Sequence, residues 1–155
     1  MIALLLRTLD QAYDKKSWHG PTLRGTLRGV CAEEAAWRPA PGRHNVWELA
    51  VHAAYWKYSV ARRLEGGERG SFPLAGSNWF PRPEELSEAA WKGDLALLGE
   101  MHRRLREAVA ALDPEQLETI PPGSKTRVVD LVLGVAAHDL YHAGQVQLLK
   151  RLRSR

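Results

Sequence analysis

Apolar side chains recur every three or four residues along most of the chain, which is the period of an amphipathic α-helix. Residues 2–16 show this first, with Leu5, Leu6, Leu9 and Tyr13 on one predicted face. Alternating apolar and polar runs are nearly absent, and the chain has no Asn-Gly or Asp-Gly pair of the kind found in hairpin turns. The pattern therefore predicts an all-helical protein.

The helical period breaks after this first segment. Gly20 and Pro21 interrupt it, and Pro21 suits the first turn of a shorter helical segment, TLRGTLRGV, at residues 22–30. The following AWRPAPGRH, at residues 36–44, is predicted to be a loop because its prolines and glycine do not continue a helix.

A longer helix is predicted to begin at Asn45. Asn45 and Glu48, three residues apart, form the pattern of a capping box, and the helix runs to about Leu64 before a Gly-Gly pair. Residues 66–83 then form a long loop with three prolines. Loops of this length within a compact domain are often functional.

Two further helices complete the prediction. One covers about 84–112 and begins at either Pro83 or Ser87, and the other covers 126–153 after the loop TIPPGSK. Four main helices predict an all-α four-helix bundle, in a single domain spanning residues 1–155.

Composition is that of an ordinary globular domain, with 45% apolar and 26% charged residues. No apolar run approaches the roughly 20 residues of a membrane span, so we expect no membrane partner. The N-terminal MIALLLRTLDQAYDKK lacks a preceding basic region and is interpreted as a helix of the mature protein. The single cysteine, Cys31, excludes an internal disulfide and favours a cytoplasmic location.

The net charge of +4 and the pI of about 9.5 make nucleic-acid binding a candidate function. The arginines are, however, spread along the chain among acidic residues, and only the C-terminal KRLRSR is a cluster. We therefore expect no nucleic-acid partner, and keep a basic nucleic-acid-binding protein as the least favoured alternative.

Three histidines form the strongest chemical signal. His138 and His142 stand four apart in HDLYHAGQ, so they leave one face of the last helix about 5–6 Å apart, and His52 lies in the middle of the helix that starts at Asn45. Each alone is explained as well by a hydrogen bond to backbone or to an aspartate. Together they predict a tri-histidine metal site with an open position for water or a substrate, as in catalytic zinc sites.

The segments HNVWELAVHAAYWK and TRVVDLVLGVAAHDLYHAGQVQLLKRL resemble the DinB/YfiT-like superfamily of bacterial four-helix bundles, and WHGPTL and WRPAPGRH extend the resemblance more weakly. It implies that His52, His138 and His142 bind a divalent metal, Zn²⁺ or Ni²⁺. It also implies up-down-down-up connectivity, with the loop at 66–83 as the crossover, and association into homodimers. Some similar proteins look like metal-dependent hydrolases, or like thiol S-transferases that use bacillithiol or mycothiol.

Several other residues are weaker candidates. Gln145 could orient a ligand or bond to the helix, and Glu48 could support an imidazole, although its capping role already explains it. Asp139 could also accept a hydrogen bond from an imidazole, but it is rather expected to pair with an arginine. His44 and His102 are interpreted as surface residues. The roles of two further residues stay open, namely His19 and Trp79.

The sequence therefore predicts a metal-dependent hydrolase or thiol S-transferase that acts on a small molecule, with a low-molecular-weight thiol as a candidate co-substrate. The alternative is a bundle that binds metal or a small ligand without turnover. A homodimer is also expected, because the helix at 84–112 carries apolar residues on more than one face, with Trp91, Leu95 and Leu98 set against Leu97 and Met101.

Overall fold

A computed structural model describes residues 1–154 of the chain. Helices are the only regular elements within this range, so the all-α prediction is confirmed. The elements in chain order are α1 (Ile2–Tyr13), α2 (Leu23–Leu27), α3 (Ala32–Ala36), α4 (Val46–Leu64), α5 (Glu88–Ala110), the short 3₁₀ helix η1 (Pro114–Glu118) and α6 (Val128–Arg153).

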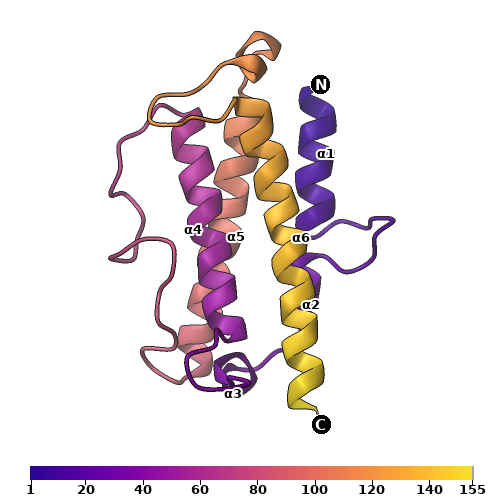
Figure 1. The fold of residues 1–155 in the computed structure, drawn as a ribbon, viewed down its shortest axis with the longest axis vertical. Coiled ribbons are helices and arrows are strands. Elements are labelled where there is room, and N and C mark those ends of the chain that lie inside the picture. The colour runs from indigo at the N-terminus through magenta and orange to yellow at the C-terminus, as the bar shows by residue number, and fades with distance from the viewer. Residues whose placement is uncertain (155) are drawn as a thin grey trace.

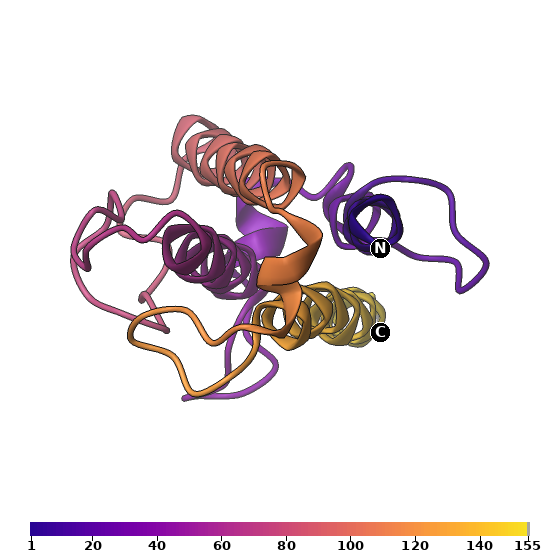
Figure 2. The same cartoon turned by 90° about the horizontal axis from the view of Figure 1, so that it is seen from above.

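The helices α1, α4, α5 and α6 lie side by side along the long axis of the molecule (Figure 1). Helices α1 and α6 run in one direction and α4 and α5 in the other, and the view from above shows the four around a common core (Figure 2). Because α4 and α5 are neighbours that run the same way, residues 65–87 must travel the length of the bundle to join them. This requirement accounts for the long loop.

Local hydrogen bonds set where the long helices begin. The Asn45 side chain accepts from the backbone N–H of Glu48 at 2.7 Å, as expected of an N-cap. The Glu48 carboxylate makes no return bond to the Asn45 backbone and binds Arg38 and His44 instead, so only half of the predicted capping box forms. The hydroxyl of Ser87 likewise accepts from Ala90, so α5 begins at Glu88 and not at residue 84. Other predicted bounds were too wide. Helix α1 ends at Tyr13, where Asp14 leaves the helical conformation, and α6 begins at Val128.

The interior consists of two apolar clusters separated by a polar layer. One cluster contains Trp47 and Trp91 near the start of α4 and α5, and the other contains Leu9, Leu105 and Val132 at the opposite end. Between them, each of the four long helices contributes one buried residue with a polar group, namely Tyr13, Lys57, His102 and Asp139.

The four residues of this polar layer form a row of contacts that runs from Asp139 through Lys57 and Tyr13 to His102. The Lys57 ammonium forms an ion pair with Asp139 in which both side chains are fully buried, and it lies 4.9 Å from the centre of the Tyr13 ring. The Tyr13 ring stacks on His102 with ring centroids 3.8 Å apart. Two predictions were therefore wrong. His102 is buried, and Asp139 pairs with a lysine, because α1, α4 and α6 enclose positions that look exposed in the sequence.

Burial dominates the electrostatics of this layer. It raises the pKa of Asp139, against the opposing effect of the Lys57 ammonium, and raises the pKa of Tyr13 to about 12. For His102, burial and then the neighbouring cations, Lys57 first, lower the pKa to about 3. His102 is therefore neutral at pH 7.

The homodimer stays a prediction. Residues of both apolar faces of α5, Trp91 and Leu98 of one and Met101 of the other, are buried within the chain itself, so these positions are internal packing. Helix α6 instead presents four exposed large apolar side chains, Leu133, Tyr141, Leu148 and Leu152. No helix in the described part of the chain is both long and apolar enough to cross a membrane.

Replacing Lys57 by methionine should destabilise the bundle by about 3–5 kcal/mol at pH 7, because Asp139 is left without its cation in a fully buried position. The double variant Lys57→Met/Asp139→Leu should recover most of this loss, since neither charge then remains. Urea unfolding of the metal-free protein, followed by circular dichroism, measures both effects.

Lys92→Met is the matched control for this pair of variants, because Lys92 is exposed on α5, outside the polar layer. Its effect should stay within about 0.5 kcal/mol. A Lys57→Met variant as stable as this control would mean that the buried ion pair contributes nothing to stability.

His102→Phe should flatten the acid side of the stability curve. Below the unfolded-state pKa of about 6.5 the unfolded chain takes up a proton that folded His102 does not bind until about pH 3. The wild-type free energy of unfolding therefore falls as pH decreases, and His102 contributes up to about 1.4 kcal/mol per pH unit. Urea unfolding of the metal-free proteins between pH 7 and pH 4 tests this, and parallel curves for the two proteins would contradict it.

Candidate metal centre

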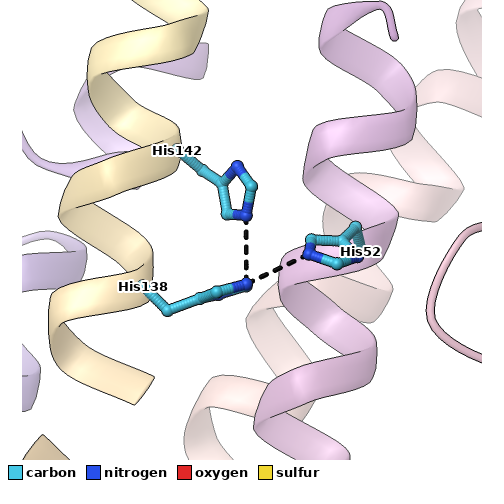
Figure 3. A group of neighbouring side chains, drawn as sticks. All are labelled: His52, His138 and His142. Atoms are coloured by element: carbon cyan, nitrogen blue, oxygen red, sulfur yellow. Dashed lines mark hydrogen bonds between the residues drawn. The ribbon is translucent and has the colours of Figure 1, made fainter. Parts of the chain in front are cut away.

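Three histidine side chains from two helices meet beside the polar layer. His52 comes from α4, and His138 and His142 come from α6 (Figure 3). The Nε2 atom of His138 lies 3.0 Å from Nε2 of His52 and 3.0 Å from Nε2 of His142. Their ligand atoms all lie within 4.8 Å of one another, in a group that could hold a metal ion. The predicted convergence of the three histidines is confirmed.

Helix geometry explains this arrangement. His142 is four positions after His138, so both leave the same face of α6, and that face packs against α4 at His52. His52 and His142 are buried and His138 is half-buried. The regular geometry of α4 and α6 and their packing against each other are therefore enough to bring the three histidines together.

Hydrogen bonds to the outer ring nitrogens fix two of the imidazoles. Nδ1 of His52 donates to the backbone carbonyl of Asn78 at 2.8 Å, and Nδ1 of His142 donates to Oε1 of Gln145 at 2.6 Å. A neutral imidazole carries one proton, so both Nε2 atoms keep their lone pair, directed at His138. Metal-binding histidines are usually held in this way by a partner on the other ring nitrogen.

This arrangement fits a cation. Nε2 of His138 can donate its one proton to only one of its two neighbours, so at least one of the two 3.0 Å contacts would otherwise set lone pair against lone pair. Two nitrogens bound to one ion at about 2.0–2.1 Å lie about 2.9–3.4 Å apart at right-angled to tetrahedral geometry, a range that includes the observed spacing. Nδ1 of His138 is buried and has no hydrogen-bond partner among residues 1–154.

The three imidazoles are also in the protonation state that a metal requires. Burial is the largest cause in each case, and it lowers the pKa of His52. It lowers the pKa of His138 to about 3, with further lowering by the other two histidines, and the pKa of His142 to about 4. All three imidazoles are therefore neutral at pH 7. Each can then offer a nitrogen lone pair to a metal, as a ligand must.

The long loop supplies contacts that the sequence did not reveal. Asn78 accepts from His52 through its backbone carbonyl and from the indole N–H of Trp56 through its side chain, at 3.0 Å. Its φ of +65° lies in the left-handed region, which asparagine adopts more readily than most residues. The surrounding sequence GSNWF carries no local signal for a contact with a histidine 26 residues away.

Trp79, the next loop residue, covers one face of the triad. Its indole stacks on His52 at a centroid distance of 3.8 Å and on His44 at 3.6 Å, with nearly parallel planes, so it is held between two imidazoles. His44 therefore belongs to the support of the site, and its interpretation as an ordinary surface residue was incomplete.

Glu48 lies one contact further out, away from the triad. Its carboxylate binds Arg38 and accepts from His44 and from the backbone N–H of Arg82. Burial raises the pKa of Glu48, but these hydrogen bonds, Arg38 first, outweigh it and lower the pKa to about 2. The candidate Glu48 thus anchors the later end of the long loop, at Arg82, whereas the candidate Gln145 contacts His142 directly.

His19 lies apart from the histidine cluster. It is exposed in the connection between α1 and α2, and the ligand group contains only the three predicted histidines.

The sequence pattern of the DinB superfamily matches residues 17–146, which is most of the chain and includes all three histidines. The chain belongs to the DinB superfamily. No curated protein and no solved structure gives a significant match. Membership in the DinB superfamily agrees with the all-helical bundle and with a histidine cluster able to hold a metal ion.

His138→Ala and His142→Ala should each abolish stoichiometric binding of Zn²⁺ or Ni²⁺ while the bundle still folds. Loss of an outer hydrogen-bond partner alone weakens metal sites about 10–100-fold, so loss of a ligand should cost more than about 100-fold. Elemental analysis of tag-free protein after dialysis against each metal measures the content, and far-ultraviolet circular dichroism reports the fold.

The matched control is His19→Ala, which removes an exposed histidine outside the cluster and should retain full metal content. Wild-type metal content in His138→Ala or His142→Ala would refute the site. Unfolding of both variants would instead make the metal part of the structural core.

Proposed function

We propose that this DinB-superfamily protein binds Zn²⁺ or Ni²⁺ through His52, His138 and His142 and uses it in a reaction on a small molecule. The observation that carries the proposal is the set of three neutral imidazoles in which Nε2 of His138 lies 3.0 Å from Nε2 of each of the other two. Both metals accept imidazole nitrogen. Three protein ligands would leave at least one position for a substrate, the usual feature of catalytic sites.

Thiol S-transfer is the reaction that the surroundings of the triad favour over hydrolysis. A divalent metal held by the three histidines would supply Lewis acidity, which favours the ionised form of a coordinated water or thiol. The triad is contacted by the amide of Gln145, the backbone carbonyl of Asn78 and the aromatic rings of Trp56, Trp79 and Tyr141. Within residues 1–154 no carboxylate is hydrogen-bonded to the triad, and a thiol nucleophile does not need such a base.

The residues around the triad then have defined tasks. Asn78 and Gln145 hold two imidazoles with their lone pairs inward, and Trp79 covers His52 and excludes water from that side. A low-molecular-weight thiol is the proposed co-substrate, and a small electrophile is the proposed acceptor. The alternative is a metal-binding or ligand-binding protein without turnover.

An assay of thiol consumption tests this proposal. Tag-free protein loaded with Zn²⁺ or Ni²⁺ is given 1-chloro-2,4-dinitrobenzene as the electrophile, with cysteine, glutathione, bacillithiol or mycothiol as the thiol. We expect metal-dependent turnover with at least one thiol, absent in His142→Ala and retained in His19→Ala. Stoichiometric metal without turnover with any of these thiols would favour the binding-protein alternative.

A further inference from the structure

A cavity of about 470 Å³ lies beside the triad. The proposed chemistry gives no role to the residues that line the end of the cavity away from His138. It lies between α4 and the first turns of α6, next to the connection that precedes α6, and His138 is part of its lining. Its volume is in the range of pockets that bind small molecules.

The walls next to His138 are apolar. They are formed by Trp56 and Val60 of α4 and by Leu131 and Val135 of α6. The hydrogen bond from Trp56 to Asn78 holds the indole in place, so this wall is preformed. Such a surface suits a hydrocarbon chain or a ring.

The charged residues of the lining carry an excess of positive charge. The one acid, Asp130, is already paired with Arg127 at 2.8 Å. Arg63 and Lys125 form no ion pair within residues 1–154, and the only hydrogen bonds of Arg63 go to Ser59 in the preceding turn. The cavity therefore offers two uncompensated cations beyond its apolar walls.

We propose that this cavity binds a small carboxylate with an apolar body. The carboxylate lies at Arg63 and Lys125, the body lies on Trp56 and the α6 wall, and the opposite end points toward His138. A planar guanidinium pairs with a carboxylate through parallel hydrogen bonds, which makes Arg63 the specific partner and Lys125 a supporting charge. The inference rests on the proposed function in one respect, because it names the class of molecule on which the triad acts.

Two probes with the same body separate charge from apolar contact, namely 4-phenylbutyrate and 4-phenylbutan-1-ol. Isothermal titration calorimetry of the full chain is performed with the zinc-loaded and the metal-free protein at low salt. We expect the acid to bind about tenfold more tightly than the alcohol in both forms. Added sodium chloride should weaken binding of the acid and leave the alcohol unchanged.

Two variants locate the probe. Arg63→Met should lower the affinity of the acid to that of the alcohol, whereas Arg7→Met, an exposed arginine on α1, should not. Gly134→Leu should abolish binding of both probes, because Gly134 lines the cavity and a Cβ there meets no other atom within 4 Å, so the larger side chain can occupy the space of the probe. Gly93→Leu is the matched control, since Gly93 is also helical and open but lies on α5, outside the cavity.

Several results would overturn the proposal: equal affinities for acid and alcohol, an unchanged preference in Arg63→Met, undiminished binding in Gly134→Leu, or no binding of either probe. A preference seen only with zinc and kept in Arg63→Met would place the carboxylate on the ion and overturn it as well. The proposed metal-dependent function can fail while the carboxylate site holds. A protein that binds no zinc but still prefers the acid through Arg63 would contradict the metal-dependent function and support the carboxylate site.

Discussion

The buried ion pair between Lys57 and Asp139 fixes the register of α4 against α6, and the metal centre depends on that register. His52 lies on the helix of Lys57, and His138 is the residue directly before Asp139. If α6 moved by one turn, about 5.4 Å, Asp139 would lose its lysine and the two α6 histidines would move away from His52. Apolar contacts alone tolerate such shifts more easily, because the hydrophobic effect is non-directional. A buried charge without its partner is costly, so the polar layer can select a single register.

The direction of the helices gives the long loop its role. Since α4 and α5 run in parallel, the chain must return along the outside of the bundle, and residues 65–87 pass the triad on the way. Glu48, through Arg38 and the backbone of Arg82, ties this passage to the start of α4. Asn78 and Trp79 are then brought against His52. The same connectivity that lengthens the loop supplies the outer contacts of the site.

Features that arise from local sequence were predictable. Distant contacts were not, apart from the meeting of His52 with the two α6 histidines, which the chemistry of the three residues and the family resemblance indicated. The cap at Asn45 and the spacing of His138 and His142 need only neighbours within one turn, so they could be read from the sequence. Lys57 stands between Trp56 and Tyr58 with no acidic residue beside it, and its partner Asp139 lies 82 residues away. His102 likewise lies among charged residues, yet α1 covers it through Tyr13.

Charge links the triad to the cavity beside it. The three imidazoles are neutral, and their outer partners, Asn78 and Gln145, are neutral as well. A divalent ion at the triad would thus keep its two positive charges, unlike an ion held by thiolates or carboxylates. Arg63 and Lys125 add positive charge at the other end of the same cavity. Both ends therefore attract anions, and the apolar wall between them sets the spacing. The cavity can therefore hold a thiolate at the triad and a carboxylate at Arg63 at the same time, because each anion is neutralised by positive charge at a different end.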